Sequence, residues 1–123
     1  MSSLFEVTAD LERRLLRCRL SGRWTRDTVI EYRDAVGQAA ERLFAAGIKR
    51  SQINVLLDAR EFKAQSQDVA AFYQEQFNRP NMAVHKVATV ASDLVFRLQA
   101  TRVGAQEQQL FETERDALDW LSE

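Results

Sequence analysis

A continuous apolar run near the middle of the chain most constrains its fold. Val55, Leu56 and Leu57 are adjacent in residues 53–58, just before Asp58. A strand with one face in water alternates apolar and polar side chains, so this run indicates a strand that is buried on both sides. The sequence therefore predicts that residues 53–58 form the central strand of a sheet.

The residues before this strand predict a hairpin followed by a helix. Residues 4–9 and 14–20 alternate apolar and polar side chains around a polar turn, as paired antiparallel strands do. Thr25 can cap a helix that reaches about residue 46, because its hydroxyl can accept a hydrogen bond from a free backbone N–H of the first turn. Gly47 suits the left-handed conformation that ends many helices.

The rest of the chain continues to alternate helices and strands. Helices are expected in residues 66–77 and 94–103, and strands in residues 84–91 and 108–112. Thr113, with Asp116 three residues later, resembles the capping box of a last helix. The order is ββαβαβαβα, which predicts a single α/β domain over residues 1–123 with a mixed five-stranded sheet.

Strand parity and helical spacing also predict the core. The side chains expected on inner faces are Leu16, Cys18, Val55, Leu57, Val90 and Trp120.

Composition and charge exclude several classes of protein. Hydrophobic residues make up 46% and charged residues 28% of the chain, as is typical of a soluble globular domain. No apolar run approaches the roughly 18 residues of a membrane span, and residues 1–12 do not resemble a signal peptide. The 17 basic and 18 acidic residues nearly cancel, which argues against binding nucleic acid through a surplus of positive charge. We therefore expect a cytoplasmic protein with no nucleic-acid partner and no stable membrane anchor.

The chain has few residues suited to catalysis or metal binding. Cys18 is its one cysteine and His85 its one histidine, so it can form neither an internal disulfide nor a structural zinc site. Its glycines do not occur in the spacings that cradle phosphates. We expect no enzyme and no cofactor, and we interpret Cys18 as a small core residue.

Two groups of polar residues have a catalytic or metal-binding alternative. His85 with Ser92 and Asp93 could be written as a triad, but a triad is recognised by geometry and not by spacing. An acidic group with helical spacing could be a carboxylate metal site, although acids near a helix start are explained by the helix dipole. This group is Glu112, Asp116 and Asp119.

Residues 13–26 contain several arginines and no acidic residue. These arginines are Arg13, Arg14, Arg17, Arg19, Arg23 and Arg26. We interpret them as a solvated strand face with cross-strand partners such as Glu6. The alternatives are an anionic partner, or self-association with the acidic segment 107–119.

Four segments together resemble a known family. They are Leu20-Ser21-Gly22, residues 55–62 (VLLDAREF), residues 87–90 (VATV), and Leu110-Phe111 with Ala117, Trp120 and Leu121. In these segments the chain resembles the STAS domain, in its SpoIIAA-like (STAS/SEC14) branch. The resemblance implies a mixed sheet with helices mainly on one face, and a role in binding rather than in turnover.

The resemblance also singles out Ser66. In the sporulation anti-sigma factor antagonists of this fold, the loop after the central strand carries a phosphorylated serine in an Asp-Ser-x-Gly setting. The corresponding residues 62–68 contain Ser66 with no aspartate before it and no glycine after it. We interpret Ser66 as a helix N-cap and keep a regulatory phosphosite as the alternative.

Two binding functions follow from this reasoning. The first is a non-catalytic regulatory or scaffolding module that binds a protein partner and can form a homodimer. The alternative, suggested by the SEC14 resemblance, is a carrier or sensor of a small apolar ligand or lipid.

The helix expected at residues 94–103 has more apolar residues than a single buried face needs. Leu94, Val95 and Leu98 suffice for an inward stripe. The candidate interaction surface on another side is then Phe96, Ala100 and Val103. In the alternative rotation Phe96 lies in the core and Leu98 at an edge.

Overall fold

The computed structural model describes residues 4–77, 84–91 and 105–123. Its strands are β1 (Phe5–Asp10), β2 (Leu15–Gly22), β3 (Asn54–Phe62), β4 (Val84–Val90) and β5 (Ala105–Phe111). Its helices are α1 (Arg26–Ala45), α2 (Gln67–Phe77) and α4 (Glu114–Leu121), with a short 3-10 turn η1 (Arg50–Gln52). The helix expected at residues 94–103, with the candidate surface Phe96, Ala100 and Val103, lies outside the described residues.

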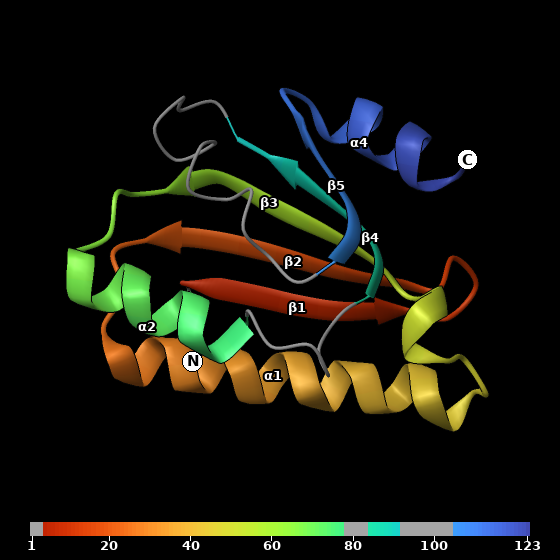
Figure 1. The fold of residues 1–123 in the computed structure, drawn as a ribbon, viewed down its shortest axis with the longest axis horizontal. Coiled ribbons are helices and arrows are strands. Elements are labelled where there is room, and N and C mark those ends of the chain that lie inside the picture. Colours follow the sequence, from red (N-terminus) through yellow and green to blue (C-terminus); the bar gives the residue numbers. More distant parts are fainter. Residues whose placement is uncertain (1–3, 78–83, 92–104) are drawn as a thin grey trace.

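The strands form one mixed sheet in the order β1-β2-β3-β4-β5 (Figure 1). β1 pairs antiparallel with β2, and every later pair is parallel. This arrangement confirms the predicted hairpin at one side of a largely parallel sheet, with β3 at its centre.

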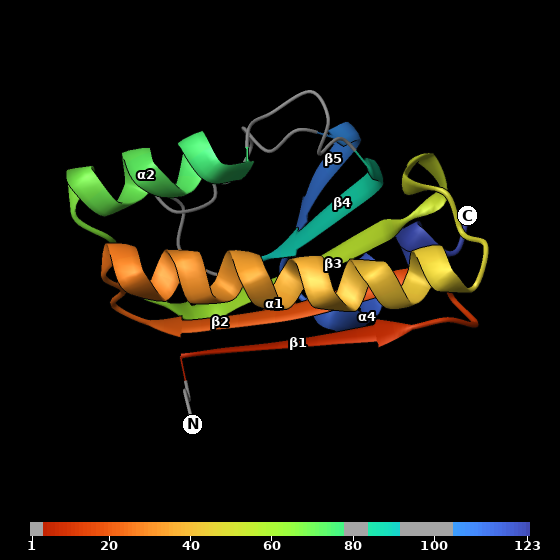
Figure 2. The same ribbon diagram turned by 90° about the horizontal axis from the view of Figure 1, so that it is seen from below.

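The two faces of the sheet carry different helices. The helices α1 and α2 pack on one face, and α4 covers part of the other, so that Figure 2 shows α1 in front of the sheet and α4 behind it. On β3, Leu57 faces the first layer and Leu56 the second. The apolar run of the central strand is explained because both of its faces meet a helix.

Most of the predicted core is confirmed. Leu16, Cys18, Leu57 and Val90 are buried, whereas Val55 and Trp120 lie on the predicted inner faces and pack against the core but are only half-buried. Val55 borders a small cavity between the sheet, α1 and α2. The Trp120 ring lies at the edge of α4, where it contacts Lys86 and Phe111.

Local signals set the helix ends as expected. The Thr25 Oγ1 accepts a hydrogen bond from the Thr28 N–H at 3.3 Å, and the Thr113 Oγ1 accepts one from the Asp116 N–H at 3.2 Å. Gly47 follows α1 with φ +86°, the left-handed conformation that favours glycine.

Candidate functional site

Ser66 caps α2, as predicted. Its Oγ accepts a hydrogen bond from the Val69 N–H at 3.2 Å, and its carbonyl accepts one from the Ala70 N–H at 2.9 Å. The side chain is exposed after the carboxyl end of β3. Phosphorylation of Ser66 stays a prediction.

The Ser66→Ala variant is expected to lose about 0.5–2 kcal/mol of unfolding free energy, because an N–H of the first turn of α2 loses its acceptor. Urea denaturation measures the loss. Ser51→Ala is the matched control, since Ser51 is exposed in η1 and its change should stay within about 0.5 kcal/mol. Equal stability of Ser66→Ala and the unmodified protein would contradict the cap.

The loop before Ser66 is held by its neighbour Gln65. The Gln65 Oε1 accepts a hydrogen bond from the Trp24 N–H at 2.7 Å, while its Nε2 donates to the Gly22 carbonyl at 3.0 Å. The Gly22 carbonyl also accepts from the Lys63 N–H at 3.1 Å. This loop is therefore tied to the end of β2 by both side-chain and backbone bonds.

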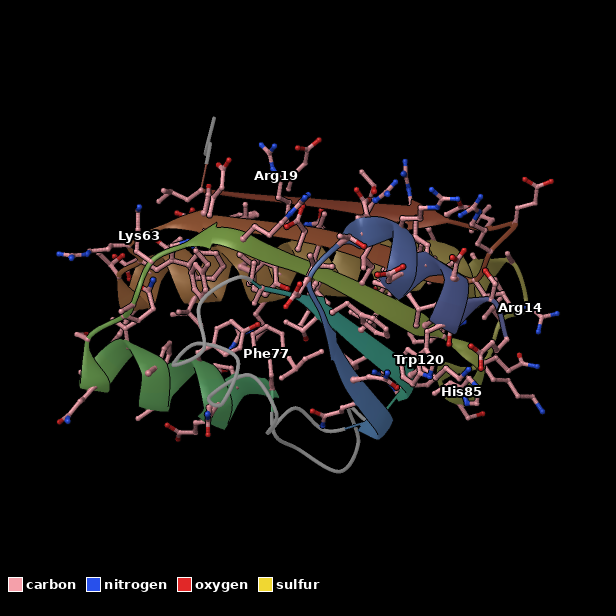
Figure 3. The ribbon with its side chains drawn as sticks, turned by 90° about the horizontal axis from the view of Figure 1, so that it is seen from above. Arg14, Arg19, Lys63, Phe77, His85 and Trp120 are labelled. Carbon is pink, nitrogen blue, oxygen red and sulfur yellow. The ribbon has the colours of Figure 1, made fainter. Side chains whose placement is uncertain are left out.

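Arg17 and Arg19 of β2 lie beside both acidic and basic side chains on the sheet face that carries α4. Figure 3 labels Arg19 on this face. Arg19 pairs with Glu6 at 3.7 Å, and Arg17 pairs with Glu114. Beside them, hydrogen bonds from Arg60 lower the pKa of the Asp58 carboxyl from its usual value. The cross-strand interpretation is confirmed for Arg19 and Glu6.

The remaining arginines of residues 13–26 differ in whether they form an ion pair. Arg26 forms a bidentate pair with Asp68, at 2.9 and 3.1 Å. No ion pair among residues 4–77, 84–91 and 105–123 involves Arg13, Arg14 or Arg23.

Cys18 is a core residue, as predicted. It is 1% exposed, and burial raises the pKa of its thiol to about 11 despite a hydrogen bond with Tyr32. The thiol therefore stays protonated near neutral pH, and a protonated, buried thiol is a poor nucleophile.

The catalytic and metal alternatives gain no support from the described residues. His85 lies at the start of β4, where its N–H donates to the Ile53 carbonyl at 2.9 Å, and Ser92 and Asp93 lie outside the described residues. The acidic residues Glu112, Asp116 and Asp119 are exposed. In the part of the chain that the structure describes, no group of three or more His, Cys, Asp or Glu residues is placed to hold a metal ion.

A small apolar cavity lies between α1, α2 and the sheet. Its volume is ≈80 Å³, and its lining includes Cys18, Tyr32, Val55, Tyr73 and Phe77. An engineered cavity of about 150 Å³ binds benzene, so the space bordered by these described residues is smaller than one known to hold a small aromatic ligand. Carriage of an apolar ligand or lipid stays a prediction.

Two features had little or no signal in the sequence. Among the described residues no strand pairs with the outer edge of β1, because β1 ends the sheet order; we call this edge open. A polar cavity lies at the end of the sheet where the parallel strands begin, between the β1–β2 turn and α4. In the sequence, the only hint of this region is the turn at residues 11–14, which contains neither glycine nor asparagine. The structure shows that Arg14 in this turn adopts a φ of +54°.

None of the described helices is long and apolar enough to cross a membrane.

Comparisons with known proteins place the fold. No family model and no curated protein matches the chain. A similar solved structure is that of an uncharacterized protein from the DUF3478 family with a SpoIIAA-like fold, from Shewanella loihica PV-4. The two chains are 23% identical, the TM-score is 0.63, and the match covers 98% of each chain. This chain therefore has a SpoIIAA-like fold.

Proposed function

We propose that this protein is a non-catalytic regulatory or scaffolding module whose protein partner is a second copy of the chain. The observation that carries the proposal is the open edge of β1, which ends the sheet (Figure 2). Exposed edge strands offer unpaired backbone groups to another strand. The two copies would join their β1 strands across a two-fold axis, as in most homodimers.

The hydrogen-bond pattern of the hairpin defines which backbone groups face the open edge. The Leu4 carbonyl accepts a hydrogen bond from the Ser21 N–H at 2.9 Å, so these residues form a hydrogen-bonded pair. Such pairs alternate along an antiparallel ladder. Phe5, Val7 and Ala9 therefore direct their N–H and C=O groups away from β2.

Two β1 strands can pair antiparallel in a register centred on Val7, in which their backbone groups and side chains are compatible. This register pairs Val7 with the second copy's Val7 and Phe5 with the second copy's Ala9, and all of these residues have outward-facing amides. On the charged face it places Glu6 opposite Thr8. The register centred on Thr8 would instead oppose Glu6 and Asp10, and like charges directly opposite one another are destabilising.

β1 carries some but not all of the devices that protect natural edges from pairing. Charged side chains, above all lysine, together with proline and β-bulges are common protections. The strand reads FEVTAD, with the acidic residues Glu6 and Asp10 but with neither lysine nor proline. Its pairing with β2 runs without a register shift from Phe5 to Asp10.

Proline substitution at neighbouring positions tests the proposal. Val7→Pro removes an N–H that faces the open edge, so this variant is expected to fold and to sediment as a monomer. The unmodified protein is expected at twice the chain mass of 14.1 kDa. Thr8→Pro is the matched control, because it removes an N–H of the ladder with Arg17 and should destabilise the fold.

Hydrogen exchange of the unmodified protein gives a second test that needs no variant. The Val7 amide is expected to become protected as the protein concentration rises, whereas the amide of Thr8 is protected at every concentration. A monomer at high concentration, or a Val7→Pro variant that still dimerises, would refute this function.

A further inference from the structure

We infer that α4 detaches from the sheet as a unit while the sheet stays folded, and that its detachment uncovers the Lys86 amine and an apolar surface of the sheet. Figure 1 shows α4 apart from α1 and α2, and its buried residues belong to a different core cluster. The inference goes beyond the proposed dimer, because it concerns α4 and not the edge of β1.

The helix α4 depends on docking for its own order. It has 8 residues, and isolated helices shorter than about 12–15 residues are marginal in water. Its buried residues are Ala117 and Leu121, whereas α1 has 20 residues and a much longer buried stripe. Elements with few buried apolar contacts detach at the lowest free-energy cost. We therefore expect α4 to leave the sheet well before α1 does.

Two polar contacts tie the ends of α4 to β2 and β3. Glu114, at the start of the helix, pairs with Arg17 of β2. At its other end the Leu121 carbonyl accepts a hydrogen bond from the Asn54 Nδ2 at 3.3 Å. Water replaces these partners once the helix leaves, so such contacts contribute little net free energy to docking.

Lys86 of β4 acts on both positions of α4. The residue is 7% exposed, and no ion pair among the described residues involves it. Its Nζ donates to the Trp120 carbonyl at 3.2 Å and to the Glu123 carbonyl at 3.4 Å, and it lies 4.9 Å from the centre of the Trp120 ring. The helix dipole and this ring favour the docked position. A buried ammonium without a carboxylate partner is costly, so the hydration of Lys86 favours the detached position.

The sheet surface beneath α4 is apolar. It is formed by Leu15, Leu56, Ala88 and Val90, which share one core cluster with Ala117 and Leu121 of the helix. Leu56, Ala88 and Val90 are each 0% exposed. The detached state therefore presents an apolar surface next to one amine, and both are hidden while α4 is docked.

Acetylation of the lysines by N-hydroxysuccinimide acetate tests the detachment. The amine attacks the ester carbonyl, an amide forms, and N-hydroxysuccinimide leaves with the proton. Lys49 and Lys63 are exposed and serve as references in the same chain. Lys86 is expected to react more than about tenfold more slowly than either reference, at a rate that α4 detachment limits.

Hydrogen exchange gives a second measure of the same event. The amides of residues 117–121 are expected to exchange together, more than about tenfold faster than the amides of the central strand β3. Their common rate would show that the helix detaches as a unit and does not fray residue by residue.

The variant Glu114→Gln links the two measurements. It removes the ion pair with Arg17 and keeps the length of the side chain. It is expected to speed both Lys86 acetylation and the exchange of the α4 amides by about two- to fivefold, and to leave the exchange of β3 unchanged. Glu112→Gln is the matched control, because it removes an equal charge near the same end of α4 and no ion pair among the described residues involves Glu112. Neither rate should change in this control.

Three results would overturn the inference. The first is that Lys86 and the α4 amides react no faster than the amides of β3, which would mean that only global unfolding exposes them. The second is that Lys86 reacts as fast as Lys49 and Lys63, or that the α4 amides exchange at unrelated rates. The third is that Glu114→Gln behaves like Glu112→Gln. None of these readouts depends on pairing between β1 strands.

Discussion

Replacing Trp24 with alanine is expected to lower the free energy of unfolding by about 3–5 kcal/mol. Trp24 is 5% exposed, and its ring centroid lies 4.9 Å from that of Phe62 and 5.1 Å from that of Tyr32. Its Nε1–H donates to the Ser21 carbonyl at 2.9 Å. The substitution would leave a cavity where β2, α1 and the end of β3 meet, and it would also remove this hydrogen bond.

Urea denaturation followed by circular dichroism measures the effect. Trp24→Phe is the matched control, because it keeps an aromatic ring among its neighbours and loses the indole N–H; we expect it to cost clearly less than the alanine variant. If Trp24→Ala lowers the unfolding free energy by less than about 1 kcal/mol, the contacts of Trp24 with Tyr32 and Phe62 do not hold the sheet and helices together.

Replacing Leu57 with alanine is expected to cost about 2–5 kcal/mol of unfolding free energy. Leu57 is 6% exposed, on the central strand β3, and belongs to the core layer beneath α1 and α2. Neighbouring strands lie on both sides of β3, so the surroundings cannot readily close the space that the side chain leaves.

Leu11→Ala is the matched control for this variant. Leu11 is 51% exposed in the β1–β2 turn, and its truncation should change stability by no more than about 0.5 kcal/mol. Equal unfolding midpoints for the two variants would contradict the placement of Leu57 in the core.

The sequence predicted those parts of the fold that depend on local patterns. The apolar run Val55, Leu56 and Leu57 indicated a strand that is buried on both faces, because strand side chains alternate in direction. Thr25 and Ser66 marked the starts of α1 and α2, because each hydroxyl bonds to an N–H only three residues away. These interactions are short-range, so they can be read from neighbouring residues alone.

Contacts between distant segments were decided by the tertiary structure. Arg17 pairs with Glu114, 97 positions along the chain, after α4 has docked on the sheet. Lys86, a charged residue in an apolar strand, is buried because its Nζ donates to the Trp120 carbonyl at 3.2 Å and lies over the Trp120 ring. A cation at the carboxyl end of a helix is favoured by the helix dipole. The residue pattern of β4 could not predict that Lys86 would contact Trp120.

The candidate sites depend on tertiary structure for the same reason. Asn54 and His85 are separated along the chain, and only strand pairing and the docking of α4 bring them to one cavity. The open edge of β1 likewise follows from the strand order, which no residue of β1 encodes by itself. Local sequence thus determined which segments form strands and helices, whereas the sites arose from long-range packing, because their groups meet only in the folded chain.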